Sequence, residues 1–485
     1  MLDPACGSGH ILVYAFDLLA AMYEERGYRP VDAARLILEK NLVGFEVDER
    51  AAQLASFALV MKGCELAGRR FLRKGVRTHV RLLSSVAFDD SELAEIPGVA
   101  ERGRLVDALA HLSECGSLFV PEAGDVEALE AALASVGEGS LFADALRQKL
   151  ESAIRSCRVL AQKFEVVAGN PPYMGSSNFG AWLSKWMKKN YPDTKSDLCT
   201  AFIECNLRFI QERGMAAQIT MQSWMFLGSF EKFREKLLAD KSILSMAHLG
   251  ARGFDSIGGE VVSTTAFVTY YGQSHENGVY FRLVDVLGEQ AKREAYLEAI
   301  HNPDCGYFYR ADASTFSDIP GTPIAYWATP GLMRSFGNGV QLADIAKPCT
   351  GFTTGNNDIF LRLWHEVSLS SVGIKWFYMN KGGSFRRWYG NREYVVDWEN
   401  NGERIKACPG STVRNEELYF QESVTWGKIS SSLLSARYSS AGTLFDAVGL
   451  CCFSVGKLTL LEVLATLNSN VARLALAILA PTLSF

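Results

Sequence analysis

The residues with the clearest chemical capability are Asn170-Pro171-Pro172-Tyr173, which follow an apolar run at 164–168. The Asn170 side-chain amide oxygen and the Pro171 carbonyl can each accept one N–H hydrogen bond from an amino group. A ring-attached amino group is a weak nucleophile because its lone pair is delocalised, and two such acceptors draw it toward tetrahedral geometry. The prolines fix the direction of the carbonyl, and Tyr173 offers a face for stacking. The tetrapeptide therefore predicts methyl transfer to an exocyclic amino group.

A second candidate site is the N-terminal loop DPACGSG at 3–9. Glycines in a turn let a ligand approach the backbone, and a following helix offers free N–H groups. The dinucleotide fingerprint GxGxxG and the phosphate loop GxxxxGK[ST] are both absent. The loop resembles motif I of S-adenosylmethionine-dependent adenine methyltransferases. That resemblance implies that Asp3, Ala5, Gly7 and Gly9 form a cofactor loop around the methionine part of the cofactor.

A third candidate is Glu46, at the end of the short apolar run 42–47. An acidic residue ending the second strand can accept hydrogen bonds from both hydroxyls of a ribose. Its separation from Gly9 exceeds the usual ~20 residues, which predicts an extra helix between them. Asp48 is the weaker candidate, because it is expected in the turn. We therefore expect Glu46 to hold the ribose.

Together the two motifs resemble the amino-methyltransferase class of the Rossmann-like superfamily. If the acceptor is a DNA base, it must flip out of the duplex to reach such a pocket. NPPY also occurs in enzymes that methylate protein glutamine or guanine in ribosomal RNA, so this motif leaves the acceptor open. Ser223 and Trp224, which follow the next expected strand, are further candidates to line the pocket.

Five longer stretches carry a further resemblance: Pro171–Phe179, Gly258–Phe267, Gly351–Asn357, Tyr378–Trp398 and Ile429–Tyr438. They resemble the adenine-specific methyltransferases of BREX phage-defence systems, the PglX family. The resemblance implies N6-methylation of adenine in double-stranded DNA with S-adenosylmethionine, as a mark of host DNA, with other defence subunits as possible partners.

The segment Lys375–Tyr394 independently predicts a nucleic-acid surface. Five basic residues stand there against a single acidic one, Glu393, and seven aromatic residues are interleaved with them. Cations position phosphates or read guanine edges, and aromatic rings stack on bases or pack. The alternative is a β-rich core with solvated basic residues. The residues expected to bind DNA are Lys381, Arg386, Arg387, Trp388 and Arg392.

These candidate residues require a sheet whose strands end at the loops that carry them. Helices alternate with strands before residue 90 and again after 164, which predicts an α/β, Rossmann-like sheet with crossover helices. We expect a catalytic domain at 1–275, a connector at 276–335 and a mixed α/β target-recognition domain at 336–485. Within the first, 90–160 has helical spacing and no motif, and is expected to be a solvated helical insertion.

Composition excludes several classes of protein. Of the 485 residues 48% are hydrophobic and 21% charged, which excludes a disordered chain. No apolar run reaches the ~18 residues of a membrane span, and no signal peptide precedes the first loop. The 11 scattered cysteines suit a reducing cytoplasm, and neither zinc nor another metal site is expected. The net charge of −5 argues against a uniformly basic binder but not against local basic patches.

Only Met1 and Leu2 precede the first motif, whereas its strand ordinarily contributes more apolar residues. The chain is therefore expected to be a fragment of a longer protein, with an incomplete target-recognition domain. Two alternatives to a DNA methyltransferase stay open. One is a DNA-binding scaffold of the defence complex whose catalytic half is inactive. The other is a methyltransferase acting on protein glutamine, which the large second domain disfavours.

Overall fold

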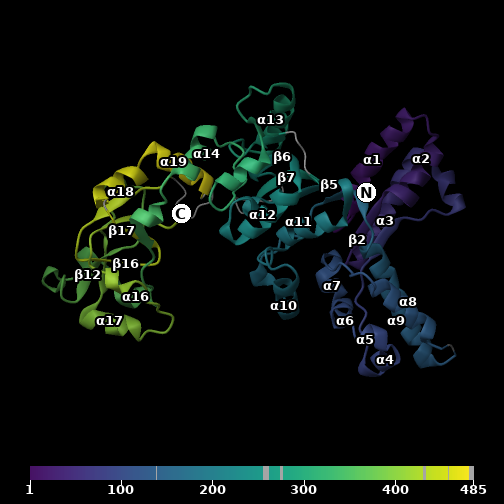
Figure 1. Cartoon of the computed structure of the whole chain (residues 1–485), viewed down its shortest axis with the longest axis horizontal. Coiled ribbons are helices and arrows are strands. Elements are labelled where there is room, and N and C mark those ends of the chain that lie inside the picture. Colours follow the sequence, from purple (N-terminus) through teal and green to yellow (C-terminus); the bar gives the residue numbers. More distant parts are fainter. Residues whose placement is uncertain (138, 255–261, 273–276, 430–432, 457, 480–485) are drawn as a thin grey trace. The chain divides into compact units, whose positions relative to one another are not determined.

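The computed structural model describes residues 1–137, 139–254, 262–272, 277–429, 433–456 and 458–479, apart from the side chain of Lys74. Two stretches of the resemblance fall partly outside these residues, at 258–261 and 430–432. The chain divides into two compact units, Met1–Phe316 and Ser317–Phe485 (Figure 1).

The first unit is built on a nine-stranded sheet of order β3-β2-β1-β4-β5-β7-β6-β8-β9. The strands from β3 to β5 are parallel, and β7 runs antiparallel between β5 and β6. The predicted Rossmann-like sheet is thus confirmed. The strands are β1 Leu2–Asp3, β2 Val43–Glu46, β3 His79–Leu82, β4 Phe164–Gly169, β5 Ile210–Met221, β6 Ser242–Ala251, β7 Ser263–Tyr270, β8 Gly278–Arg282 and β9 Phe308–Ala311.

The strand β1 is only two residues long and lies in the middle of the parallel region. Leu2 pairs with Val43 of β2 on one side and with Val167 of β4 on the other. Leu2 is completely buried. The strand order therefore changes direction between β1 and β4, where ligands of doubly wound sheets bind at the carboxyl ends of the strands.

Helices connect these strands as the sequence pattern predicts. The extra helix expected before Glu46 is present as α2, continued by a π-helical turn, Ile37–Asn41. Asp48 caps α3, because its Oδ1 accepts a hydrogen bond from the Ala51 N–H at 2.8 Å. Asp48 is thus a capping residue. The helices are α1 His10–Glu25, α2 Pro30–Leu36, α3 Glu49–Ala67, α10 Ala181–Asn190, α11 Leu198–Phe209 and α12 Glu231–Asp240.

The insertion at 90–160 is helical, as predicted, but it is not a solvated pair of helices. Its apolar residues share one core with Phe45 of β2 and Val167 of β4. Its buried carboxylate, Asp125, is 3% exposed and is paired with Arg102 at 2.9 Å and Arg104 at 3.1 Å. The prediction of a solvated pair is wrong because sequence spacing does not show which face meets the sheet. The helices are α4 Asp90–Glu95, α5 Pro97–Ala100, α6 Gly103–Ala110, α7 Leu112–Cys115, α8 Asp125–Ser135 and α9 Leu141–Leu160.

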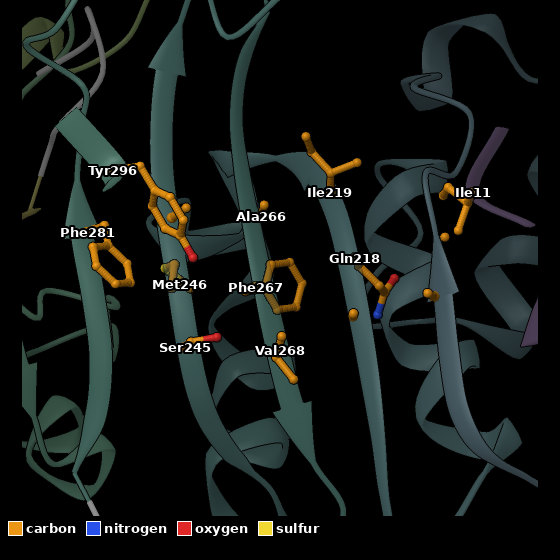
Figure 2. Close-up of a pocket in the computed structure, with 14 residues that line it drawn as sticks. Ile11, Gln218, Ile219, Ser245, Met246, Ala266, Phe267, Val268, Phe281 and Tyr296 are labelled. Atoms are coloured by element: carbon orange, nitrogen blue, oxygen red, sulfur yellow. The ribbon is translucent and has the colours of Figure 1, made fainter. Parts of the chain in front are cut away.

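One face of the sheet carries an apolar groove of about 690 Å³, shown in Figure 2. Along β5 and β7, buried residues alternate with partly exposed ones, as the two faces of a strand require. The groove lies on the partly exposed side and contains none of the predicted site residues, although Ala168 and Gly169 of β4 directly precede Asn170. It is lined by Ile11, Ala168, Gly169, Ala217, Gln218, Ile219, Ser245, Met246, Ala247, Ala266, Phe267, Val268, Phe281 and Tyr296.

The stretch predicted as a connector begins with ordered elements of the first unit. Residues 278–311 supply β8 and β9, which extend the sheet, and α13, Glu289–His301, between them. Lys292 of α13 is buried and donates hydrogen bonds to the carbonyls of Leu249 and Leu283. The glycines and prolines of this stretch therefore mark turns between short elements, and the unit boundary falls after Phe316.

The second unit contains two four-stranded sheets, of order β10-β17-β14-β15 and β11-β13-β12-β16. Phe352, Trp398, Tyr419 and Phe445 form an aromatic core there, and the predicted mixed α/β character is confirmed. The strands are β10 Ala346–Cys349, β11 Leu361–Leu363, β12 Trp376–Asn380, β13 Tyr394–Asp397, β14 Ser423–Gly427, β15 Arg437–Ser439, β16 Thr443–Phe445 and β17 Gly449–Ser454. The helices are α14 Pro330–Asn338, α15 Leu342–Ile345, α16 Asn357–Phe360, α17 Glu399–Lys406, α18 Leu460–Leu467 and α19 Asn470–Leu479.

Among the described residues no single helix is long and apolar enough to cross a membrane, although α18 and α19, bent by 67° at their break, reach that length and hydropathy as a pair. All 11 cysteines are free thiols, and eight of them are buried, in agreement with the expected cysteine usage.

Candidate functional site

Three predicted residues end three adjacent parallel strands: Asp3 ends β1, Glu46 ends β2 and Asn170 follows β4. A cavity of about 820 Å³ opens at this edge of the sheet. Five of the predicted cofactor and acceptor residues line it, namely Ala5, Gly7, Glu46, Asn170 and Pro172. The structure therefore brings together two motifs that are more than 150 residues apart in the sequence.

Backbone donors hold the Glu46 carboxylate from two sides. Its Oε2 accepts a hydrogen bond from the Gly7 N–H at 2.7 Å. Its Oε1 accepts from the Val47 and Asp48 N–H groups at 2.9 and 3.0 Å. These three bonds fix the carboxylate orientation and connect the end of β2 to the glycine loop.

Asp3 lies beneath the loop and is 1% exposed. Its Oδ1 accepts a hydrogen bond from the Ala5 N–H at 3.2 Å. Burial raises the pKa of Asp3 from 3.8 to about 7; the Ala5 hydrogen bond opposes this rise, and the charge of Glu46 adds to it. The Asp3 side chain therefore shapes the loop from within and titrates near neutral pH.

Three glycines, two in the loop and one at the end of β4, shape the surroundings of the loop. A Cβ on Gly169 would lie 3.2 Å from Pro4 Cδ, so the glycine lets the first loop touch β4. Gly9 has φ +88°, and its Cβ would lie 2.9 Å from Ala55 Cβ of α3. Gly7 has φ +52° and faces open space, since no atom lies within 4 Å of the position of a Cβ. The first two glycines thus permit close packing, and Gly7 leaves room beside the cavity.

The NPPY segment combines an exposed end with an anchored end. Asn170 and Pro172 are exposed, whereas Pro171 is buried. The Tyr173 hydroxyl donates a hydrogen bond to the Ile219 carbonyl at 3.3 Å, which ties the segment to β5. Burial raises the Tyr173 pKa above its usual value. The Asn170 amide is therefore accessible on a segment whose backbone is held.

Trp224 does not line this cavity, and that prediction is wrong. Its side chain is completely buried, donates from the indole N–H to Thr220 Oγ1 at 3.1 Å, and lies 5.0 Å from the Phe267 ring centre. The 3₁₀ turn after β5 folds the large apolar side chain back into the core. Ser223, on the same turn, is likewise not among the residues that line the cavity.

Part of the cavity wall comes from the helical insertion, which sequence reasoning did not include. The 3₁₀ turn Gly116–Leu118 is anchored to the loop 3–9, because Ser117 Oγ donates to the Pro4 carbonyl at 2.6 Å. Gly116 has φ +51°, and its Cβ would lie 3.1 Å from Val47 Cγ1. The small residues Cys115-Gly116-Ser117, which interrupt a helical pattern, are the signal that could have revealed this turn. The residues missed are Pro4, Phe45, Val47, Leu83, Glu114, Cys115, Gly116, Ser117, Leu118, Leu198 and Phe202.

In the second unit, the predicted DNA-binding residues lie on the loop 381–393 between β12 and β13. Phe385, Trp388 and Tyr389 of this loop are 49%, 54% and 60% exposed. Trp388 has φ +75°, its N–H donates to the Ala436 carbonyl at 2.9 Å, and its carbonyl accepts from Tyr438. The loop is thus anchored by its backbone to β15 and presents aromatic side chains to solvent.

The basic residues of this segment have more acidic neighbours than the sequence suggested. Lys381 is paired with Asp446 at 3.4 Å, and Lys375 with Glu399 at 3.1 Å. Arg392 donates to the Tyr389 hydroxyl at 2.9 Å and lies over the Tyr378 ring. Arg387 lies over the Phe385 ring. Arg386 is exposed and forms none of the ion pairs found among the described residues.

Comparison with known proteins identifies relatives along the whole chain. The family model of the Eco57I restriction-modification methylase matches residues 40–254. The adenine-specific methyltransferase PglX of Lacticaseibacillus casei (strain Zhang) is 39% identical over 100% of this chain. The adenine-specific methyltransferase BrxX of Escherichia coli O9:H4 (strain HS) is 38% identical over the same extent. The whole chain is thus similar in sequence to these two methyltransferases. It spans 43% of the length of each of these two relatives.

Solved structures share this fold at low sequence identity. The ATP-dependent type ISP restriction-modification enzyme LlaBIII, solved bound to DNA, superposes with a TM-score of 0.52 at 12% identity, over 97% of this chain and 33% of its own. The type IIL enzyme MmeI, in complex with DNA, gives a TM-score of 0.51 at 13% identity, over 94% and 56% of the two chains. These two likenesses concern the fold of the chain.

Proposed function

We propose that this chain carries the catalytic and target-recognition parts of an enzyme that methylates the N6 amino group of adenine in DNA. S-adenosylmethionine is the proposed methyl donor, and the methylated DNA would be marked as host DNA in phage defence. One observation carries the proposal: a single cavity contains the glycine loop, Glu46 and Asn170. The names of the 38–39% identical relatives point to the same activity.

The residues of the cavity fit S-adenosylmethionine, which supplies an electrophilic methyl group when bound. Glu46 carries a fixed carboxylate at the end of β2, suited to the two hydroxyls of a ribose. Gly7 leaves open space where a side chain would intrude. Phe45, Val47 and Leu83 provide apolar walls for a planar ring. Asp3, Ala5 and Gly9 complete the proposed cofactor loop. Asp3 accepts the Ala5 N–H hydrogen bond within it, and Gly9 permits its close packing against Ala55 of α3.

The proposed acceptor residues make a ring amino group more nucleophilic, because two hydrogen-bond acceptors draw its nitrogen toward tetrahedral geometry. Asn170 accepts one N–H hydrogen bond through its side-chain oxygen, and the Pro171 carbonyl accepts the other. Pro172 restricts the backbone between them and Tyr173, and Tyr173 stacks on the base. No charged general base is required before methyl transfer, because the amino group becomes acidic only once it is methylated.

The second unit supplies the proposed DNA contact. Exposed Arg386 and Trp388 offer a charge for the backbone and a ring for stacking. Arg387, Arg392 and Lys381 belong to the same loop but are held by aromatic or acidic neighbours. In the proposed complex the target adenine is flipped out of the duplex into the cavity. Other defence subunits are proposed partners of the full-length protein.

The test is a transfer assay with tritiated S-adenosylmethionine and amplified, unmethylated bacterial genomic DNA. Mass spectrometry of the digested DNA should find N6-methyl-2′-deoxyadenosine and no methylated deoxycytidine. A release-factor protein with an acceptor glutamine, tested in parallel, should remain unlabelled. Label in that protein would favour the glutamine acceptor, and DNA binding without cofactor binding would favour an inactive scaffold.

A further inference from the structure

The order of the strands gives the cavity a direction. From β4 through β1 and β2 to β3, the carboxyl ends carry Asn170, the glycine loop, Glu46 and then Leu83. Adjacent strands are about 4.8 Å apart, so this edge is long enough for an extended nucleoside. If the ribose lies at Glu46 and the methyl group faces Asn170, the nucleobase lies toward β3. The insertion reaches the chain that follows β3, because Ser113 Oγ lies 2.8 Å from Ser85 Oγ, two residues after Leu83.

The walls at this end are suited to a purine ring. Val47, Leu83 and, from the insertion, Leu118 are among the apolar residues that line the cavity. Leu118 is held, because its carbonyl accepts a hydrogen bond from the Tyr191 hydroxyl at 2.5 Å. Apolar walls bind the faces of a ring but do not distinguish its edges, so a polar group is needed to recognise the base.

Among the described side chains that line the cavity, most polar atoms already have another role. Glu46 accepts three backbone hydrogen bonds. Ser117 donates to the Pro4 carbonyl and is buried. Cys115 contacts the Ala108 carbonyl, and Asn170 lies at the opposite end. Glu114 is the carboxylate that remains, and it belongs to the insertion.

The Glu114 side chain is oriented by its neighbours with one oxygen left over. Its Oε1 lies 2.8 Å from His111 Nδ1. The His111 ring stacks on Trp182 with centres 4.2 Å apart, and the Trp182 indole N–H donates to Asp107 at 3.0 Å. Glu114 Oε2 lies 3.7 Å from the position of a Cβ on Gly180, just before α10. The contact with His111 and the ring stacked beside it hold the Glu114 side chain in place.

We propose that Glu114 Oε2 accepts a hydrogen bond from the exocyclic amino group of the cofactor's adenine ring. This inference rests on the proposed function, since it assigns one more contact in the same site. It gives the insertion a role as the part of the cavity that selects adenine over other purines. Adenine carries N–H donors at its amino group, whereas a purine with hydrogen at that position has none there.

The experiment compares two ligands by calorimetric titration: S-adenosylhomocysteine and its analogue in which hydrogen replaces the amino group of the purine. A hydrogen bond to a charged group that is 43% exposed should make the natural ligand bind about tenfold more tightly. Glu114→Ala should bring the ratio of the two affinities close to one. Glu114→Gln, which keeps an acceptor oxygen, should retain part of the discrimination.

The matched control is Glu127→Ala, an exposed carboxylate on α8 of the same insertion. It should leave the affinity ratio unchanged. The ratio also separates recognition from a structural role, because a variant that only loosens the insertion weakens both ligands alike. An unchanged ratio in Glu114→Ala, or a wild-type ratio near one, would overturn the assignment. Absence of binding of S-adenosylhomocysteine itself would instead overturn the proposed function.

Discussion

The proposed cofactor cavity and the loop 381–393 differ in how firmly their side chains are held before a ligand binds. In the cavity, the Glu46 carboxylate has three backbone donors, and Gly169 permits contact between the two motif loops. On the loop, rings of Phe385, Trp388 and Tyr389 face solvent while the backbone is anchored. A fixed ligand favours a rigid site, because little ordering is needed on binding. A nucleic-acid surface can keep its side chains adaptable on an anchored backbone.

The largest expected effect is on methyl transfer and comes from Asn170, at the end of the cavity proposed for the methyl acceptor. Asn170→Ala should lower methyl transfer by about a thousandfold, because one of two oriented acceptors for the target amino group is lost. Affinity for S-adenosylhomocysteine should change only a few-fold, since Asn170 is assigned to the acceptor. A tritium-transfer assay beside calorimetry measures both. Asn178→Ala, on an exposed turn of the same segment, is the control. Turnover at the wild-type rate would remove Asn170 from the proposed mechanism.

The next effect concerns the protonation of Asp3. Its pKa is about 7 in the folded protein, against an ordinary value of 3.8, so between these pH values the folded state holds a proton that the unfolded state releases. Stability therefore falls as the pH rises from about 4 to 7, by up to about 4 kcal/mol. Asp3→Asn should remove this slope and raise the melting temperature most at pH 8, measured without cofactor.

The exposed carboxylate Asp32, which is paired with Arg29, gives the control for this pH series. Asp32→Asn should leave the slope between pH 4 and 8 as it is in the wild type. If Asp3→Asn and the wild type lose stability in parallel over that range, Asp3 does not carry the buried proton.

A smaller effect is expected at the ribose end. Glu46→Gln places an amide NH₂ group among the backbone donors of Gly7 and Val47, so one of these N–H groups loses its acceptor. Cofactor affinity should fall by about ten- to a hundredfold, the scale of losing charged hydrogen bonds. Asp48→Asn is the control, because asparagine still caps α3. Equal losses in both variants would show that the ribose assignment does not distinguish the two carboxylates.

The smallest expected effect is on DNA binding by the loop 381–393. Arg386→Glu should weaken DNA binding and reduce the slope of log affinity against log salt by about one. Arg414→Glu, an exposed arginine elsewhere in the second unit, should change the slope less. Lys381→Met should also change it little, because Lys381 is already paired with Asp446. A fluorescence titration over several salt concentrations measures the three slopes. Equal slopes for Arg386→Glu and the wild type would place Arg386 outside the DNA contact.

The local parts of the site were predictable because they depend on short-range chemistry. Gly7 and Gly9 both have positive φ, as expected of a glycine turn, and Glu46 ends its strand as predicted. Trp224 was mispredicted because a position after a strand does not fix the direction of a side chain. The salt bridge between Lys381 and Asp446 joins residues 65 apart, so no local charge count could reveal it.

The sequence by itself determined the doubly wound sheet, the two motif loops and the aromatic, basic character of 381–393. These follow from the spacing of apolar residues and from the restricted geometry of glycine and proline. Only the tertiary structure decided that Glu114–Leu118 of the insertion line the same cavity as Glu46 and Asn170. A helical pattern shows that a face is apolar but not what it packs against. That partner is set by long-range contacts, such as the one between Gly116 and Val47.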